Sequence, residues 1–165
     1  MKKLMLLMLA ITLVSCAGNV QHPDFENNKM LGQRLFQLHG EENYDAIKDM
    51  YHDDLSWRSP KYGEGLVDKE TQLGYVKMYH DLYEDIHFTA KYWLPDVDTL
   101  SLKNDGSVRV FGTWSGIHSE TGNAFNLGSY HTMTFEDGKI IGGGDWFDLT
   151  GFIIESTKVK GVEEK

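Results

Sequence analysis

The chain has 165 residues, with 25 acidic against 16 basic side chains and a formal net charge of −9. This length suits a single domain with a real core, and the negative charge argues against nucleic acid or anionic lipid headgroups as partners. Because Cys16 is the only cysteine, a disulfide within the chain and a thiolate metal site are both excluded.

The first residues have the pattern of a secretory signal. Lys2 and Lys3 precede the apolar stretch 4–14, which is too short to span a bilayer comfortably. Leu13-Val-Ser-Cys16 resembles the bacterial lipobox, in which the cysteine is acylated and becomes the first residue of the mature protein. The alternative is ordinary secretion with an incidental cysteine.

These features predict the organisation of the whole chain. We expect a signal peptide over 1–15, a polar tether over 16–23, one soluble domain over 24–155 and a tail over 156–165. The resemblance to a lipobox implies a lipoprotein of the cell envelope, attached to the membrane only through a lipid on Cys16.

Three helices are expected in the first half of the domain. Apolar residues at three- and four-residue steps predict one helix from Asp24 to Gly40 and a second from about Asn43. Asp68 should begin the third, because its side chain can accept from the free amides of a helix start. Tyr79 lies on the apolar stripe of that helix, where core packing is the alternative to ligand contact.

Strands make up most of the remainder. A short strand over 55–59 precedes the third helix, and later strands are expected at 86–94, 97–103, 108–118, 124–135 and from Lys139 onward. Pro95 should stop the first of these later strands. The order of elements predicts an α+β fold, with three N-terminal helices packed on a strongly curved antiparallel sheet that leaves an internal pocket.

The last predicted hairpin carries the residues of the candidate site. An Asp137-Gly138 turn places His131 opposite Gly144 and Tyr130 opposite Asp145, if the strands pair without interruption. The preceding turn, at Thr121-Gly122, places His131 beside Phe111.

Alternation of side chains then sorts the strand residues onto two faces. The more apolar face, which we expect to line the interior, holds Phe111, Ile117, Phe125, Leu127, His131, Met133, Phe135, Trp146 and Asp148. The other face holds Trp114, His118, Tyr130, Thr132 and Asp145. On this assignment His118 and His131 face opposite ways, which argues against a shared metal ion.

Asp148 and His131 are therefore the leading polar pair, with Trp146 as a wall of the pocket. Desolvation disfavours an ionised carboxylate, so it becomes a better base near neutral pH, and a nearby imidazole could hold a water or an enolate oxygen. The alternative is structural: Asp148 caps a strand end or pairs with a basic group, and His131 is a satisfied sheet histidine.

Several segments together resemble the nuclear transport factor 2-like superfamily, and within it the SnoaL-like group of polyketide cyclases. They are Tyr51-His-Asp-Asp54 with Trp57, the run Phe111–His118, and Phe135–Ile140 followed by Asp145 and Asp148. The resemblance implies a cone with a pocket at its wide end, often a homodimer, and in the cyclases an aspartate base. Gly142-Gly-Gly144 departs from many relatives and could open the pocket, form a bulge or move the aspartates to another face.

Two functions follow from these residues. The first is binding of a small, largely apolar molecule without a cofactor or metal; the second is a cyclase or isomerase with Asp148 as base and His131, Tyr130 or Asp145 orienting the substrate. A dimeric protein-interaction module is a third alternative. The residues expected to contact the ligand are Trp57, Tyr79, Phe111, Thr113, His118, Leu127, Met133 and Trp146.

Overall fold

The computed structural model describes residues 21–159. Within this range the helices are α2 (Phe25–Gly40), α3 (Tyr44–Met50), α4 (Lys69–Leu82) and α5 (Leu149–Thr157). The strands are β1 (Tyr51–Arg58), β2 (Leu66–Val67), β3 (Tyr83–Val97), β4 (Asn104–His118), β5 (Ala124–Glu136) and β6 (Lys139–Trp146).

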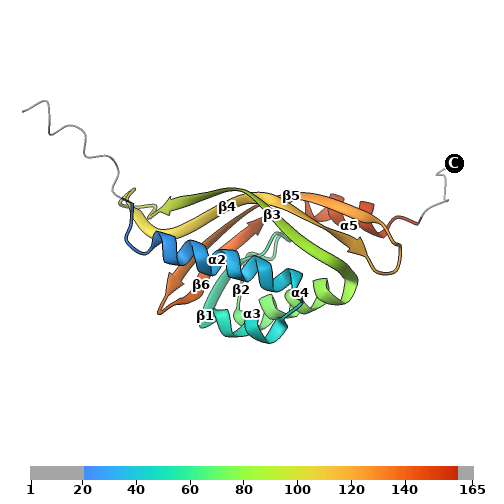
Figure 1. The fold of residues 1–165 in the computed structure, drawn as a ribbon, viewed down its shortest axis with the longest axis horizontal. Helices are drawn as coiled ribbons and strands as arrows, with labels where there is room; N and C mark the ends of the chain where they lie inside the picture. Colours follow the sequence, from blue (N-terminus) through green and yellow to red (C-terminus); the bar gives the residue numbers. More distant parts are fainter. Residues whose placement is uncertain (1–20, 160–165) are drawn as a thin grey trace, which may run out of the picture.

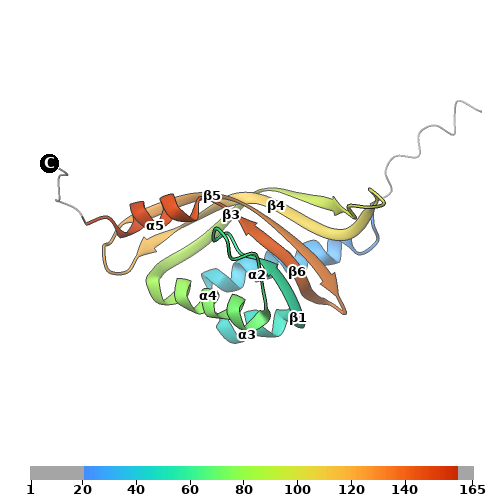
Figure 2. The ribbon, with the colours of Figure 1, turned by 180° about the vertical axis from the view of Figure 1, so that it is seen from behind.

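The strands form one curved sheet in the order β2-β1-β6-β5-β4-β3. Helices α2, α3 and α4 lie against its concave side, while α5 lies at one end, beside β4 and β5 (Figures 1 and 2). This arrangement confirms the predicted α+β fold. The sheet is not wholly antiparallel, however, because β1 pairs with β6 in parallel.

Side-chain caps fix two of the predicted helix starts. The Asn43 side chain accepts a hydrogen bond from the Ala46 amide at 3.1 Å, and Asp68 accepts from the Thr71 amide at 2.9 Å. Each carboxylate or amide oxygen satisfies a donor that has no partner inside the helix. The predicted starts of α3 and α4 are therefore confirmed.

Two strand predictions are wrong. Strand β3 continues through Pro95 to Val97, which is tolerated because β3 is an edge strand and needs no amide donor on its open side. Residues 98–103, predicted as a strand, form a turn closed by the Asp98 amide donating to the Lys103 carbonyl at 2.9 Å. Strand β1 also begins earlier than expected, directly after α3.

Helix α5 was not predicted. Asp148 is its N-cap and accepts from the Gly151 amide at 2.9 Å, so the segment that follows β6 turns into a helix instead of extending the strand. Phe152 anchors α5 on the sheet, 5.0 Å from the Tyr83 ring and 4.9 Å from the Phe125 ring. The helix ends at Thr157, beyond the domain boundary expected at residue 155.

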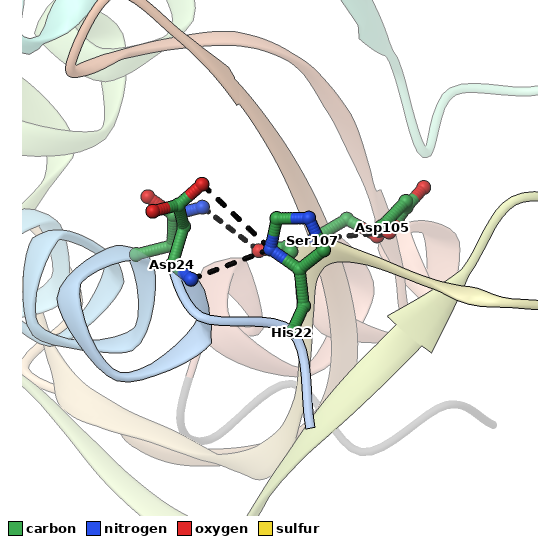
Figure 3. A network of polar contacts seen from close by, with 6 residues as sticks. His22, Asp24, Asp105 and Ser107 are labelled. Carbon is green, nitrogen blue, oxygen red and sulfur yellow. Dashed lines mark hydrogen bonds and ion pairs between the residues drawn. The ribbon is translucent and has the colours of Figure 1, made fainter. Parts of the chain in front are cut away.

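A polar network ties the start of α2 to the start of β4 (Figure 3). The His22 ring accepts from the Asp24 amide at 3.3 Å, and Asn28 donates to the Gly106 carbonyl at 2.8 Å. A side chain at Gly106 would collide with His22, with 2.8 Å from an added Cβ to Nδ1. The first described residues therefore lie at the end of the molecule far from α5 (Figure 1).

The predicted signal peptide, Cys16 and most of the tether lie outside the described residues and stay predictions. Among residues 21–159, no helix combines the length and apolar character needed to cross a membrane.

Both hairpins depart by one residue from the predicted register, β4–β5 along its whole length and β5–β6 only beyond a bulge. Thr134 pairs with Gly142 and Phe135 with Ile140, so Ile141 is an extra, unpaired residue of β6. A slip of one residue exchanges the two faces of a strand. As a result Asp145 is opposite His131 on the concave face, whereas Trp146 lies on the convex face.

Strand β4 shows the same exchange. Ile117 pairs with Ala124, because the turn is centred earlier than Thr121-Gly122. Trp114 and His118 therefore point to the concave side with Leu127, and Phe111 points outward. The prediction that His118 and His131 face opposite ways is wrong, since both lie on the concave face and are 4 % and 3 % exposed.

Candidate functional site

A cavity of about 100 Å³ lies between the helices and the concave face of the sheet. This volume is several times the ~10–15 Å³ that a single water needs, so the cavity can hold a small organic molecule. Nine aromatic side chains line it: Phe36, Tyr51, Trp57, Tyr79, Tyr83, Trp114, Phe125, Phe147 and Phe152. The other lining residues are Leu35, His39, Gln72, Val76, Ile86, Leu127, His131 and Asp145.

The polar end of the cavity is a carboxylate–imidazole pair. Asp145 Oδ1 and His131 Nδ1 are 2.7 Å apart, and the Trp57 indole donates to Asp145 Oδ2 at 2.8 Å. The side chains of His131 and Asp145 are only 4 % and 18 % exposed. A charge in such surroundings requires partners, and here each carboxylate oxygen has one.

The hydrogen bonds of His131 also define its tautomer. The Trp114 indole, which can only donate, directs its N–H to His131 Nε2 at 3.1 Å, and Ser129 Oγ lies 2.8 Å from the same nitrogen. Nε2 therefore carries the lone pair, and the proton on Nδ1 is donated to Asp145. The imidazole is neutral in this arrangement, so the pair carries the single negative charge of Asp145.

A glycine run lets Asp145 reach this position. Gly143 has a φ of +152°, and a Cβ there would lie 2.1 Å from the Thr132 carbonyl oxygen and 2.7 Å from the Trp57 ring. Only glycine fits such a backbone and such a close approach. The bulge beside this run moves Asp145 to the concave face, which is one of the outcomes that the sequence left open for Gly142-Gly-Gly144.

Helix α2 adds a second imidazole to the cavity wall. His39 lies 5.4 Å, between ring centroids, from both Trp114 and His80. Burial, with a further contribution from His80, lowers the pKa of His39 to about 3. His39 is therefore neutral near pH 7 and can donate or accept one hydrogen bond at each nitrogen.

Two tyrosines in the wall keep their protons even in alkaline solution. Burial, and then the Asp145 carboxylate, raise the pKa of both Tyr51 and Tyr79. Their hydroxyl groups therefore act as neutral hydrogen-bonding groups.

The structure brings five of the predicted site residues together around the cavity. They are Trp57, Tyr79, Leu127, His131 and Asp145. Met133 and His118 are also on the concave face but contribute to packing beyond the cavity wall: Met133 is fully buried in the core, and His118 Nδ1 lies 3.2 Å from Thr121 Oγ1.

The placement predicted for Asp148 is wrong. Its side chain caps α5 and is exposed, so it does not pair with His131 inside the pocket. The role is structural, but it differs from the predicted alternative, because Asp148 caps the start of a helix and not the end of a strand.

Four other predicted site residues lie on the convex face. Phe111 and Trp146 are 41 % and 44 % exposed, and the Tyr130 ring lies between them, with centroids 4.5 and 5.2 Å away. Thr113 pairs with Gly128 on the same face. The one-residue register shifts place Phe111, Thr113 and Trp146 outside, whereas Tyr130 is on the face opposite His131, as the alternation of side chains predicted. None of the four residues lines the cavity.

Sequence reasoning missed the helical half of the wall. The cavity is lined from α2 by Leu35, Phe36 and His39, from α4 by Gln72 and Val76, and at the end of the chain by Phe152 of α5 and by Phe147 just before it. The sequence of α2 did indicate that His39 faces the interior, because His39 follows Leu35 by four residues and so lies on the same side of the helix. Trp114 was missed because of the register error in β4.

Comparison with known proteins identifies the family of this chain. A family model for the SnoaL-like domain matches residues 33–142, and the chain belongs to this family. A search of curated proteins finds no match.

Solved structures share the fold at low sequence identity. A SnoaL-like polyketide cyclase from Jannaschia sp. is 13 % identical with a TM-score of 0.67, over 85 % of this chain and 98 % of that chain. A protein of ketosteroid isomerase-like fold from Catenulispora acidiphila, in complex with trimethylamine, is 12 % identical with a TM-score of 0.63, over 81 % and 97 %. TerC, crystallised with polyporic acid, is 20 % identical with a TM-score of 0.61, over 79 % and 98 %.

Proposed function

We propose that the domain binds a small, largely apolar molecule in the cavity, with the Asp145–His131 pair as its polar anchor. The observation that carries this proposal is an aromatic cavity of about 100 Å³ with a half-buried carboxylate in its wall, hydrogen-bonded at both oxygens. Concave apolar sites with a few convergent polar groups are typical of ligand pockets. Complexes of two similar structures with trimethylamine and polyporic acid support a binding role.

A pair of variants on opposite faces of the sheet tests this proposal. Leu127→Phe should fill part of the cavity, whereas Ile117→Phe adds the same ring on the convex face. In an NMR screen of a library of small apolar molecules, the wild type and Ile117→Phe should bind the same compounds and Leu127→Phe should lose them. Equal binding by all three proteins would contradict the proposal.

The Asp145–His131 pair favours proton transfer as a second candidate function. The carboxylate lines an apolar cavity, and His131, 2.7 Å away, holds it in one orientation. Asp145 would take a proton from a carbon beside a carbonyl group and return it to another position, which is isomerase or cyclase chemistry without a cofactor. This assignment gives Asp145 the role that the sequence suggested for Asp148.

Hydrogen exchange at carbon tests this chemistry without knowledge of the natural substrate. With small cyclic ketones in D₂O, the wild type should speed deuterium incorporation beside the carbonyl, and Asp145→Asn should reduce the rate to background. Asp148→Asn is the matched control, because Asn also caps a helix and the residue lies outside the cavity. A loss of exchange in Asp148→Asn, with retention in Asp145→Asn, would refute the assignment.

We also propose that the convex face joins two copies of the chain. Tyr92, Phe111, Tyr130 and Trp146 are directly opposite one another on β3, β4, β5 and β6, and three of them are 41–53 % exposed. No Asp or Glu occurs in 107–119 or 124–135, although the chain is strongly acidic. Two acidic copies can therefore approach closely at this face with little charge repulsion.

The attachment to the membrane is proposed from the sequence alone. The signal-like start and Leu13-Val-Ser-Cys16 support cleavage before Cys16 and acylation of that cysteine. In cells fed a labelled fatty acid, the wild type should carry label and fractionate with the envelope membranes, while Cys16→Ala should carry none. An unlabelled, secreted wild type would contradict the lipid anchor.

A further inference from the structure

The cavity wall has an unbalanced charge. Among the described residues that line it, one is a carboxylate, Asp145, and none is lysine or arginine. His131 is neutral because its Nε2 accepts from Trp114, and burial keeps His39 neutral near pH 7. The hydrogen bonds to Asp145 come from neutral donors, so they stabilise its charge without cancelling it.

The remainder of the wall is suited to a positive charge. Nine of the seventeen lining residues are aromatic, and their ring faces carry partial negative charge. A cation placed over such rings is attracted to their faces, and aromatic cages are a known means of recognising quaternary ammonium groups. An anion in the same space would meet both the ring faces and Asp145.

We propose that this cavity selects a small organic cation over neutral and anionic molecules of the same shape. The inference rests on the proposed binding function and specifies the chemical class of its ligand. The observation behind it is charge complementarity: an aromatic cavity with one carboxylate and no cationic side chain in its wall.

The hydrogen bonds of Asp145 refine the class further. Trp57 already donates to Oδ2, and His131 to Oδ1. A primary ammonium has three N–H donors, and a largely aromatic wall gives them few acceptors, so part of its hydrogen bonding to water would be lost. A tertiary or quaternary ammonium has one such donor or none and keeps its charge. The geometry therefore favours a methylated ammonium group.

Three probes of matched size test the charge preference in the wild-type chain. They are choline, its neutral carbon analogue 3,3-dimethyl-1-butanol, and the anion 3,3-dimethylbutyrate. By isothermal titration or NMR, choline should bind at least about tenfold more tightly than the neutral alcohol, which corresponds to 1.4 kcal/mol, and the anion should bind most weakly. Ethanolamine, a primary ammonium, should bind more weakly than choline.

The outcomes separate this inference from the proposed function. Tighter binding of the neutral alcohol than of choline would overturn the cation preference and leave the binding function intact. If neither choline nor the alcohol binds, the inference is refuted and the proposed function loses its support as well.

Two substitutions test whether Asp145 and the aromatic wall cause the preference for a cation. Asp145→Asn should bring the affinities for choline and the neutral alcohol within about twofold of each other, whereas Asp148→Asn should keep the full difference. Phe147→Leu removes one ring from the wall but keeps apolar volume, so it should weaken choline binding a few-fold and leave the alcohol unchanged. A preference that is unchanged in both Asp145→Asn and Phe147→Leu would overturn the assignment to this cavity.

Discussion

Asp145 and Asp148 are three residues apart in the sequence and have different surroundings in the structure. Asp145 is held inside the cavity by Trp57 and His131, and Asp148 caps an exposed helix end. Their positions depend on one unpaired residue in β6, Ile141, because it exchanges the sheet faces on which the later side chains of β6 lie. For these two aspartates, the face of the sheet or the helix end on which the side chain lies determines its role, because the side chains themselves are identical.

Removal of the indole donor to Asp145 should destabilise the fold. Trp57→Phe keeps an aromatic ring but leaves Oδ2 of a half-buried carboxylate without its 2.8 Å partner, which should cost about 1–3 kcal/mol in the free energy of unfolding. Urea denaturation measures this change. Trp146→Phe on the convex face is the control and should change stability by less than ~0.5 kcal/mol. Equal losses in the two variants would argue against a structural role for this hydrogen bond.

His39 should make stability depend on pH. Its pKa is about 3 in the folded protein, below the ordinary value of 6.5, so the unfolded chain binds the proton more readily. The contribution of His39 is thus fully present above pH 6.5 and is lost as the pH falls towards 3. Unfolding free energies of His39→Gln should decline less steeply with acidification than those of the wild type, whereas exposed His87→Gln should follow the wild type. Parallel curves for all three proteins would contradict the burial of a neutral imidazole.

The sequence was sufficient to identify most of the elements that hold these residues. Caps and periodicity predicted α2, α3 and α4, and turn residues predicted the β4–β5 and β5–β6 hairpins. It did not reveal the bulge in β6, because Gly142-Gly-Gly144 was compatible with several backbone paths. Nor did it reveal α5, whose capping residue, Asp148, had been interpreted as part of a strand.

The bulged path of β6 should depend on Gly143. In Gly143→Ala, the methyl group would lie 2.1 Å from the Thr132 carbonyl oxygen, on a backbone with φ of +152°, so the variant should lose at least ~2 kcal/mol of stability. Thermal or urea unfolding measures this loss. Gly128→Ala in β5 is the matched control, since an added Cβ there meets no atom within 4 Å and stability should be nearly unchanged. A stable Gly143→Ala variant would show that β6 can follow another path.

Helix α5 closes one end of the cavity through Phe152 and depends on its cap. Asp148→Ala removes the acceptor for the Gly151 amide and should cost about 1 kcal/mol, whereas Asp148→Asn should cost less. Amide hydrogen exchange along 149–157 measures the change locally. Faster exchange confined to this helix is expected, and unchanged exchange in Asp148→Ala would contradict a capping role.

At the scale of the whole molecule, the two ends of the cone carry different features. The start of α2 is held at the start of β4, and α5 lies at the opposite end (Figures 1 and 2). Phe147 and Phe152, which line the cavity, belong to the α5 end. The cavity wall therefore combines residues of the α5 end with residues of α2, α4 and β1.

The convex face should control assembly of the whole molecule. If Phe111, Tyr130 and Trp146 join two copies, replacing both Phe111 and Trp146 by serine should convert a dimer into a monomer in sedimentation experiments. The ligand affinity of the cavity should be retained, because these side chains lie on the other face. A wild type that sediments as a monomer at high concentration would rule out this contact.

The most direct measurement of the central claim uses the indole N–H signals of the four tryptophans. Trp57 and Trp114 line the cavity and hydrogen-bond to Asp145 and His131, whereas Trp146 lies on the convex face. When the protein is titrated with a small molecule that it binds, the Trp57 and Trp114 signals should shift together and the Trp146 signal should stay in place. A shift confined to Trp146, with Trp57 and Trp114 unchanged at saturation, would contradict the cavity as the binding site.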